Sequence, residues 1–291
     1  GDVRFHVQVM GDGPVMLLLH GTGASTHSWR GLLPLLAKHY TIVAPDLPGH
    51  GFSDYLGMNG LSITGMAASI QALLRKLGLE PGIAVGHSAG AAILVRMALD
   101  RQIQPELIIS LNGALAPFGG FVGQFFSPVA RMLATLPLLS MLFARRARDP
   151  DVIRDILKQT GSKLDPEGIA LYSRLAGNAD HVTAALGMMA NWDLQTLERD
   201  RPRLQTPVAL STGLRDEMVR PNVAREVAAR VPSAFLAPAA GLGHLAHEEA
   251  PGRIAELILS LAEGERPARA PLRPARNRTA GMTTSIAGER P

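Results

Sequence analysis

The stretch Gly86-His87-Ser88-Ala89-Gly90 holds residue types that could do chemistry. It reads G-x-S-x-G, with an apolar run at 83–85 before it and small and apolar residues at 91–95 after it. Strand, sharp turn and helix form the context in which this motif exposes a serine as a nucleophile. Glycines flank so tight a turn because side chains there would clash. The alternative is a turn that only joins a strand to a helix.

The partners that such a serine needs stand downstream, at Asp216 and His244. A serine hydroxyl is a poor nucleophile at neutral pH unless a base takes its proton. A histidine can accept that proton and return it to the leaving group. An aspartate can fix the imidazole tautomer and stabilise the imidazolium. All three residues follow predicted strands, so we expect them at one edge of a parallel sheet, in the order nucleophile, acid, base.

Each partner also has a structural interpretation. Asp216 could be a turn or capping residue, and His244 could be a packed loop histidine. His247 is the competing base. We favour His244 because it follows Gly243 in a tight loop, whereas His247 is expected at the start of the next helix.

An oxyanion hole is expected where the apolar run 15–19 ends in His20-Gly21-Thr22-Gly23. Loops at the carboxyl ends of inner strands are where open α/β sheets bind ligands. The backbone N–H groups of Thr22 (or Gly23) and Ala89 would stabilise the negative oxygen. The alternative is a simple turn from strand to helix. His50, which lies between two glycines, is interpreted as structural.

The elements that must position these residues alternate along the chain, as in a parallel sheet with helices on both faces. Ser62 and Gly78 are expected to begin and end one of the helices. The predicted strands are 3–9, 15–19, 41–44, 82–86, 107–111, 207–212 and 233–237, and the predicted helices are 28–39, 63–77, 89–99, 221–230 and 248–262.

The alternation stops at 113–200, where no strand is evident and helices are predicted at 128–143, 150–159, 166–176 and 180–190. An insertion after the strand at 107–111 predicts a helical cap over the site. Its first part is apolar and aromatic. Most of these side chains are expected to pack the cap onto the body, and some to line an apolar substrate pocket. The substrate-binding candidates are Phe118, Phe121, Phe125 and Phe126. Arg145, Arg146 and Arg148 are interpreted as a solvated face.

Composition and charge divide the 291 residues further. The net charge is +4, but six Arg and one Glu lie between Arg266 and Pro291, so the remainder carries about −1. We therefore expect a core at 1–112 and 201–264, a cap at 113–200 and a disordered basic tail at 265–291. The sequence outside the tail shows no basic patch that would indicate nucleic-acid binding. No apolar run is long enough to span a membrane.

Cysteine is absent, which excludes disulfides and thiolate chemistry and fits a cytoplasmic protein. Contact with the membrane surface stays open as an alternative. No cluster of metal ligands is visible, and we expect no cofactor. Because the chain starts at Gly1 rather than Met, residues are expected to precede it.

These motifs resemble the α/β-hydrolase superfamily. The resemblance covers about residues 3–262 and rests on His20-Gly21-Thr22-Gly23, Asp46-Leu47-Pro48-Gly49-His50-Gly51, the elbow at 86–90, the loop 213–216, and Gly243-His244 with Glu249 and Pro251. More narrowly, the runs 18–29, 86–92 and 110–115 are similar to the magnesium-chelatase accessory proteins of bacteriochlorophyll biosynthesis.

The resemblance implies an α/β-hydrolase fold and a role near magnesium insertion into a tetrapyrrole, with chelatase subunits as partners. The expected activity is that of a serine hydrolase on an apolar acyl or ester substrate. The alternative is a non-catalytic protein that binds a tetrapyrrole or assists the chelatase. Epoxide hydrolases and haloalkane dehalogenases are disfavoured, because their elbow nucleophile is an aspartate. Haloperoxidases without cofactors, carbon–carbon bond hydrolases and aminopeptidases share the same triad and remain open.

Overall fold

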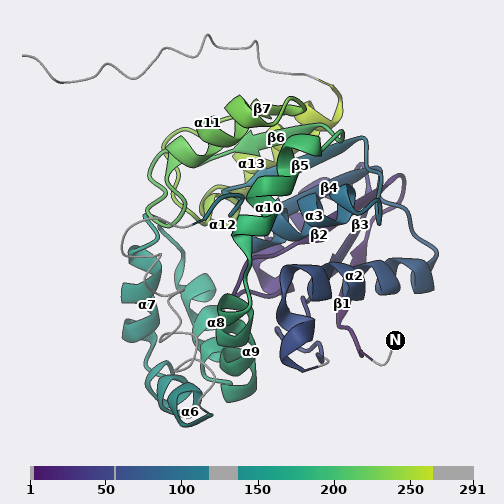
Figure 1. The fold of residues 1–291 in the computed structure, drawn as a ribbon. Coiled ribbons are helices and arrows are strands. Elements are labelled where there is room, and N and C mark those ends of the chain that lie inside the picture. Colours follow the sequence, from purple (N-terminus) through teal and green to yellow (C-terminus); the bar gives the residue numbers. More distant parts are fainter. Residues whose placement is uncertain (1–2, 56, 118–136, 265–291) are drawn as a thin grey trace, which may run out of the picture.

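The computed structural model describes residues 3–55, 57–117 and 137–264. Within them, the central sheet has seven strands in the order β1-β3-β2-β4-β5-β6-β7 (Figure 1). β1 runs antiparallel to β3, and every other neighbouring pair is parallel. The expected α/β-hydrolase fold, mostly parallel and flanked by helices, is confirmed. The strands are β1 (Val7–Met10), β2 (Val15–Leu19), β3 (Thr41–Pro45), β4 (Ile83–His87), β5 (Leu107–Leu111), β6 (Val208–Ser211) and β7 (Ala234–Leu236).

Two hydrophobic layers cover the sheet, because alternate residues of each strand point to opposite faces. Leu17 and Leu19 of β2 belong to the layer under α2 (Ile63–Leu77), α3 (Ala89–Leu99) and α11 (Pro221–Arg230). Met16 and Leu18 belong to the opposite layer. That layer contains the 3-10 helix η1 (Thr26–Trp29), α1 (Leu33–Leu36) and α13 (Pro251–Ala262).

The start and end of α2 agree with the capping residues predicted from the sequence. Ser62 Oγ accepts from the N–H of Gly65, and Gly78 ends the helix at φ +64°, a left-handed conformation that suits glycine. A second 3-10 helix, η2 (Met58–Leu61), leads into it.

Three predicted elements differ from the structure. β1 starts at Val7 rather than at residue 3, because the carbonyls of Arg4 and His6 accept hydrogen bonds from Asp54 and Asp46 instead. The helix expected at 28–39 is only η1 and the short α1. The last helix is divided into α12 (Ala246–Glu249) and α13 by Pro251, which lacks an N–H and disfavours a helical residue before it.

Helices fill the described part of the segment between β5 and β6. They are α6 (Pro137–Arg146), α7 (Pro150–Lys158), α8 (Pro166–Ala176), α9 (Ala179–Ala190) and α10 (Leu194–Asp200), followed by the 3-10 helix η3 (Arg201–Arg203). Figure 1 shows α6–α9 grouped on one side of the sheet, with α10 leading back over α3. An ion pair of 2.9 Å between Arg96 and Asp200 fastens α10 to α3. We call residues 137–200 the helical insert.

Candidate active site

Ser88 occupies a strained turn between β4 and α3. Its φ of +49° is rare for a residue with a side chain, and such strain is typical of functional sites. A Cβ added to Gly86 would lie 2.5 Å from the N of Ala91, and one on Gly90 would lie 2.1 Å from the O of Leu19. Both glycines of the motif are therefore required by packing.

Asp216 and His244 are joined by a hydrogen bond of 2.9 Å between His244 Nδ1 and Asp216 Oδ2. The other carboxylate oxygen, Oδ1, accepts from the N–H groups of Met218 and Val219, both at 2.8 Å. The aspartate is thereby held rigidly, and both side chains are buried. Because a carboxylate oxygen accepts, His244 Nδ1 carries the proton and Nε2 is free to act as a base.

Asn112, which the sequence analysis did not single out, also binds this carboxylate. Its Nδ2 donates to Asp216 Oδ2 at 2.6 Å, and its backbone has a φ of +50° at the end of β5. The signal in the sequence is a polar residue directly after a buried strand, at the edge where Ser88 also lies.

The helical insert packs tightly under the acid and base loops. A Cβ on Gly161 would lie 1.8 Å from the O of Arg215, and one on Gly243 would lie 2.4 Å from the O of Gly161. The N–H of His244 donates to the O of Thr160, and the N–H of Leu245 donates to Ser162 Oγ. The insert therefore helps to fix where the imidazole stands.

His87 connects the elbow to the base loop. Its Nε2 donates to the carbonyl O of His244 at 3.0 Å, and the two rings lie 4.8 Å apart. No hydrogen bond joins Ser88 Oγ to His244 Nε2 in the part of the chain that the structure describes. This contact is often long in unliganded hydrolases and shortens when substrate binds.

The loop at 21–23, where the oxyanion hole is predicted, lies against the elbow. A Cβ on Gly21 would lie 3.0 Å from the Cβ of Ser88 and 2.8 Å from His87 Nδ1. Thr22 is thus one residue from this contact. On the other side of Ser88, the N–H of Ala89 lies in the first turn of α3, where backbone N–H groups have no acceptor within the helix.

The geometry favours His244 over His247 as the base. His247 is fully buried in α12, with its ring 4.7 Å from that of Trp29 and 4.4 Å from that of His87. Burial lowers its pKa to about 3. His50 fits the structural interpretation, because it is buried and its Nδ1 donates to the O of Pro48 at 3.0 Å.

The substrate-binding candidates Phe118, Phe121, Phe125 and Phe126 lie outside the described residues. Arg145, Arg146 and Arg148 are exposed, in agreement with a solvated face. Across the described ranges, no three His, Cys, Asp or Glu side chains are grouped to hold a metal ion. The helices described here include none that could cross a membrane.

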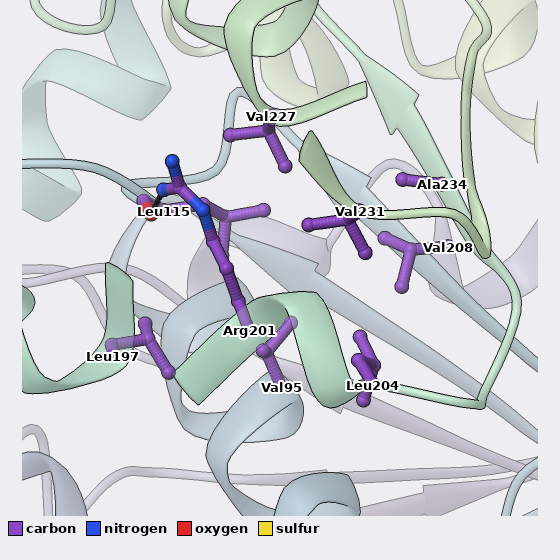
Figure 2. A pocket seen from close by; sticks show the side chains of 9 residues that line it. All are labelled: Val95, Leu115, Leu197, Arg201, Leu204, Val208, Val227, Val231 and Ala234. Atoms are coloured by element: carbon purple, nitrogen blue, oxygen red, sulfur yellow. Dashed lines mark hydrogen bonds between the residues drawn. The ribbon is translucent and has the colours of Figure 1, made fainter. Parts of the chain in front are cut away.

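A small apolar cavity lies between the sheet, α10 and α11 (Figure 2). The space open to the centre of a water molecule is ≈ 10 Å³, which holds about one water. The buried guanidinium of Arg201 extends along it and donates to the carbonyl of Leu115. Ser88 and His244 do not line this cavity, and it is too small for a substrate.

The comparison with known families decides the classification. The family model described as alpha/beta hydrolase fold matches residues 14–251. The chain belongs to the α/β-hydrolase family. The relatives found include the magnesium-chelatase 30 kDa subunit of Rhodobacter capsulatus, which is 40% identical to this chain over 253 residues. The match covers 87% of this chain and 88% of the relative. Both resemblances inferred from the motifs are therefore confirmed.

Solved structures of α/β-hydrolases agree with this fold. An alpha/beta hydrolase fold protein from Burkholderia ambifaria has a TM-score of 0.75 at 22% identity, covering 89% of this chain and 94% of its own. An esterase from Exiguobacterium antarcticum has a TM-score of 0.73 at 16% identity, covering 90% and 96%. At these identities the likeness concerns the fold alone.

Proposed function

We propose that this protein is a serine hydrolase that cleaves an ester, thioester or similar acyl bond in an apolar substrate. Ser88 is the nucleophile, His244 the base and Asp216 the residue that orients the base. The observation that carries the proposal is the 2.9 Å hydrogen bond from His244 Nδ1 to Asp216 Oδ2, beside a serine held at φ +49°.

The reaction follows from this arrangement. His244 Nε2 takes the proton of Ser88 Oγ as that oxygen attacks the carbonyl carbon. The N–H groups of Thr22 and Ala89 stabilise the oxyanion of the tetrahedral intermediate. Collapse of the intermediate expels the alcohol or thiol, which takes the proton from His244. A water molecule then attacks the acyl-enzyme in the same way and releases the carboxylic acid.

Hydrolysis of 4-nitrophenyl esters of increasing acyl length tests the proposal. Ser88→Ala should lower kcat/KM by a factor on the order of 10⁴. The matched control is Ser211→Ala at the end of β6, whose buried hydroxyl has no hydrogen-bond partner and whose loss should leave activity unchanged. Equal rates for Ser88→Ala and the unaltered protein, or no activity in either, would contradict the proposal.

The physiological role proposed for this activity is accessory to magnesium chelation in bacteriochlorophyll biosynthesis. The relative named as a magnesium-chelatase subunit supports it, because the likeness covers most of both chains. The substrate would be an apolar tetrapyrrole or a related acyl compound, and chelatase subunits would be partners. The Phe side chains at 118, 121, 125 and 126 are the proposed lining of its pocket.

The second candidate is a non-catalytic protein that binds a tetrapyrrole or assists the chelatase, and the same relative favours it. Quenching of fluorescence during titration with protoporphyrin separates the two functions. Under this alternative, Ser88→Ala should bind and assist as well as the unaltered protein. Absence of porphyrin binding, together with no effect on the chelatase rate, would exclude it.

We further propose that 1–112 and 201–264 form the catalytic core, that 113–200 form a cap, and that 265–291 form a basic tail.

The protein would act in the cytoplasm at the membrane surface. Met141, Leu142 and Phe143 of α6 are exposed, next to exposed Arg145 and Arg146, a combination suited to anionic lipid. Co-sedimentation with phosphatidylglycerol vesicles should fall for Phe143→Ser and should not for Leu214→Ser. Equal sedimentation of both variants would contradict this placement.

A further inference from the structure

The loop at 21–23 is held from two sides. On one side, Gly21 packs against His87 and Ser88, as described above. On the other side lies α9 of the helical insert. Thr22 Oγ1 donates to Met188 Sδ at 3.4 Å. A second loop of the core, at 49–51, also packs closely against α9, since a Cβ on Gly49 would lie 2.5 Å from the Cβ of Ala184.

His181, in the first turn of α9, makes the most specific of these contacts. It is 4% exposed, and its two ring nitrogens reach two different loops of the core. The N–H of Gly51 donates to His181 Nδ1 at 3.1 Å, and His181 Nε2 lies 3.2 Å from the carbonyl O of Gly23. Because Nδ1 accepts, Nε2 carries the proton and donates to Gly23.

The partner loop is itself rigid, so this contact can transmit position. Asp46 accepts hydrogen bonds from the N–H groups of Thr26 and Phe52, at 2.7 and 2.9 Å. A Cβ on Gly51 would lie 2.1 Å from Asp46 Oδ2. The ring of His50 meets that of His181 edge to face at 5.2 Å. Gly51 is therefore a fixed point, from which the imidazole reaches to Gly23.

We propose that His181 is a positioning residue for the oxyanion hole. By binding the Gly23 carbonyl it fixes the peptide planes of the loop and thereby the direction of the Thr22 N–H. The helical insert is then part of the catalytic apparatus, through a bond made 158 residues along the chain. This inference rests on the proposed hydrolase function.

The test compares three variants with 4-nitrophenyl butyrate. His181→Leu should lower kcat about 10- to 100-fold with little change in KM, less than the loss of an oxyanion-hole donor outright. His181→Gln, which keeps an N–H donor, should recover part of that loss. Thr183→Ala is the matched control, because its hydroxyl binds Ser140 and the carbonyl of Ala179 rather than the loop. Its kcat should stay at the level of the unaltered protein.

Inhibition by phenylboronic acid distinguishes a positioning role of His181 from a merely structural one. Its adduct with a serine places an oxygen in the oxyanion hole, so its Ki should rise in His181→Leu by the same factor as kcat/KM falls. A loss of kcat that tracks only the folded fraction, an increase in KM alone, or an unchanged Ki would overturn the inference.

Hydrogen exchange separates failure of this inference from failure of the hydrolase proposal. The Ala24 amide, which donates to the O of Gly21 within the loop, should exchange faster in His181→Leu and not in Thr183→Ala. An unchanged exchange rate would refute the proposal that His181 positions the loop 21–23, even if the protein hydrolyses no ester. Faster exchange in a protein without Ser88-dependent activity would refute the hydrolase proposal and the catalytic role of His181, and leave only the contact.

Discussion

Asn112 Nδ2 lies 2.6 Å from Asp216 Oδ2, the same oxygen that binds His244 Nδ1. Asn112→Gly keeps the left-handed backbone and removes this donor. Without it the carboxylate is less firmly oriented, and we expect kcat to fall about 10-fold, in the range typical of residues that orient a ligand or base. Steady-state kinetics measure this. An unchanged kcat would mean that Met218 and Val219 suffice to hold Asp216.

The two candidate bases should respond very differently to substitution. His244→Ala should lower kcat/KM by a factor on the order of 10⁴, as the loss of a triad member does. His247→Phe should retain activity, because both ring nitrogens of His247 lack hydrogen-bond partners and its ring packs against those of Trp29 and His87. The account would be wrong if His247→Phe were the inactive variant.

Buried histidines should make the fold sensitive to acid. Burial lowers the pKa of His20 and His247 to about 3 and that of His27 to about 4. The unfolded chain takes up these protons below about pH 6.5 and the folded chain does not. Stability is thus fully present above pH 6.5 and falls as pH decreases toward 4, by about 1.4 kcal/mol per pH unit for each histidine.

Urea unfolding at pH 7 and pH 5 measures this loss. In His247→Phe the free energy of unfolding should depend less steeply on pH, because roughly one proton fewer is taken up on unfolding. His39→Phe, at an exposed position, is the control and should leave the dependence unchanged. Equal free energies of unfolding at both pH values would contradict the prediction.

Glu248 should produce the opposite dependence at higher pH. Its carboxylate is fully buried between Arg30, at 3.0 Å, and the hydroxyl of Tyr172, at 2.7 Å. Burial raises its pKa to about 7, although both partners lower it. The stability that protonated Glu248 contributes is fully present below about pH 4.5 and is lost as pH rises through about 7.

The side chain in Glu248→Gln cannot ionise. The free energy of unfolding of this variant, relative to that of the unaltered protein, should therefore rise by roughly 2–3 kcal/mol between pH 5 and pH 8. Glu256→Gln, exposed on α13, is the matched control and should show no such gain. Parallel stability curves for Glu248→Gln and the unaltered protein would show that Tyr172 and Arg30 keep the carboxylate ionised.

Local patterns predicted most of the fold, because the strands are continuous apolar runs and signals such as Ser62 and Gly78 mark helix ends. They also predicted that Asp216 and His244 meet, since both follow strands of one parallel sheet. Asn112 and His181 were missed, because a single polar residue carries no periodic signal. Their partners lie 104 and 158 residues away. The pairing of β5 with β6 brings Asn112 to Asp216, and the packing of the helical insert on the core brings His181 to Gly23.

Labelling with a fluorophosphonate tests the central claim most directly, because the reagent reacts only with an activated serine. The account predicts a single phosphonate on the unaltered protein, mapped by peptide mass spectrometry to Ser88. It also predicts none on Ser88→Ala and much slower labelling of His244→Ala. Labelling of Ser88→Ala at the same rate, or no labelling of the unaltered protein, would contradict the account.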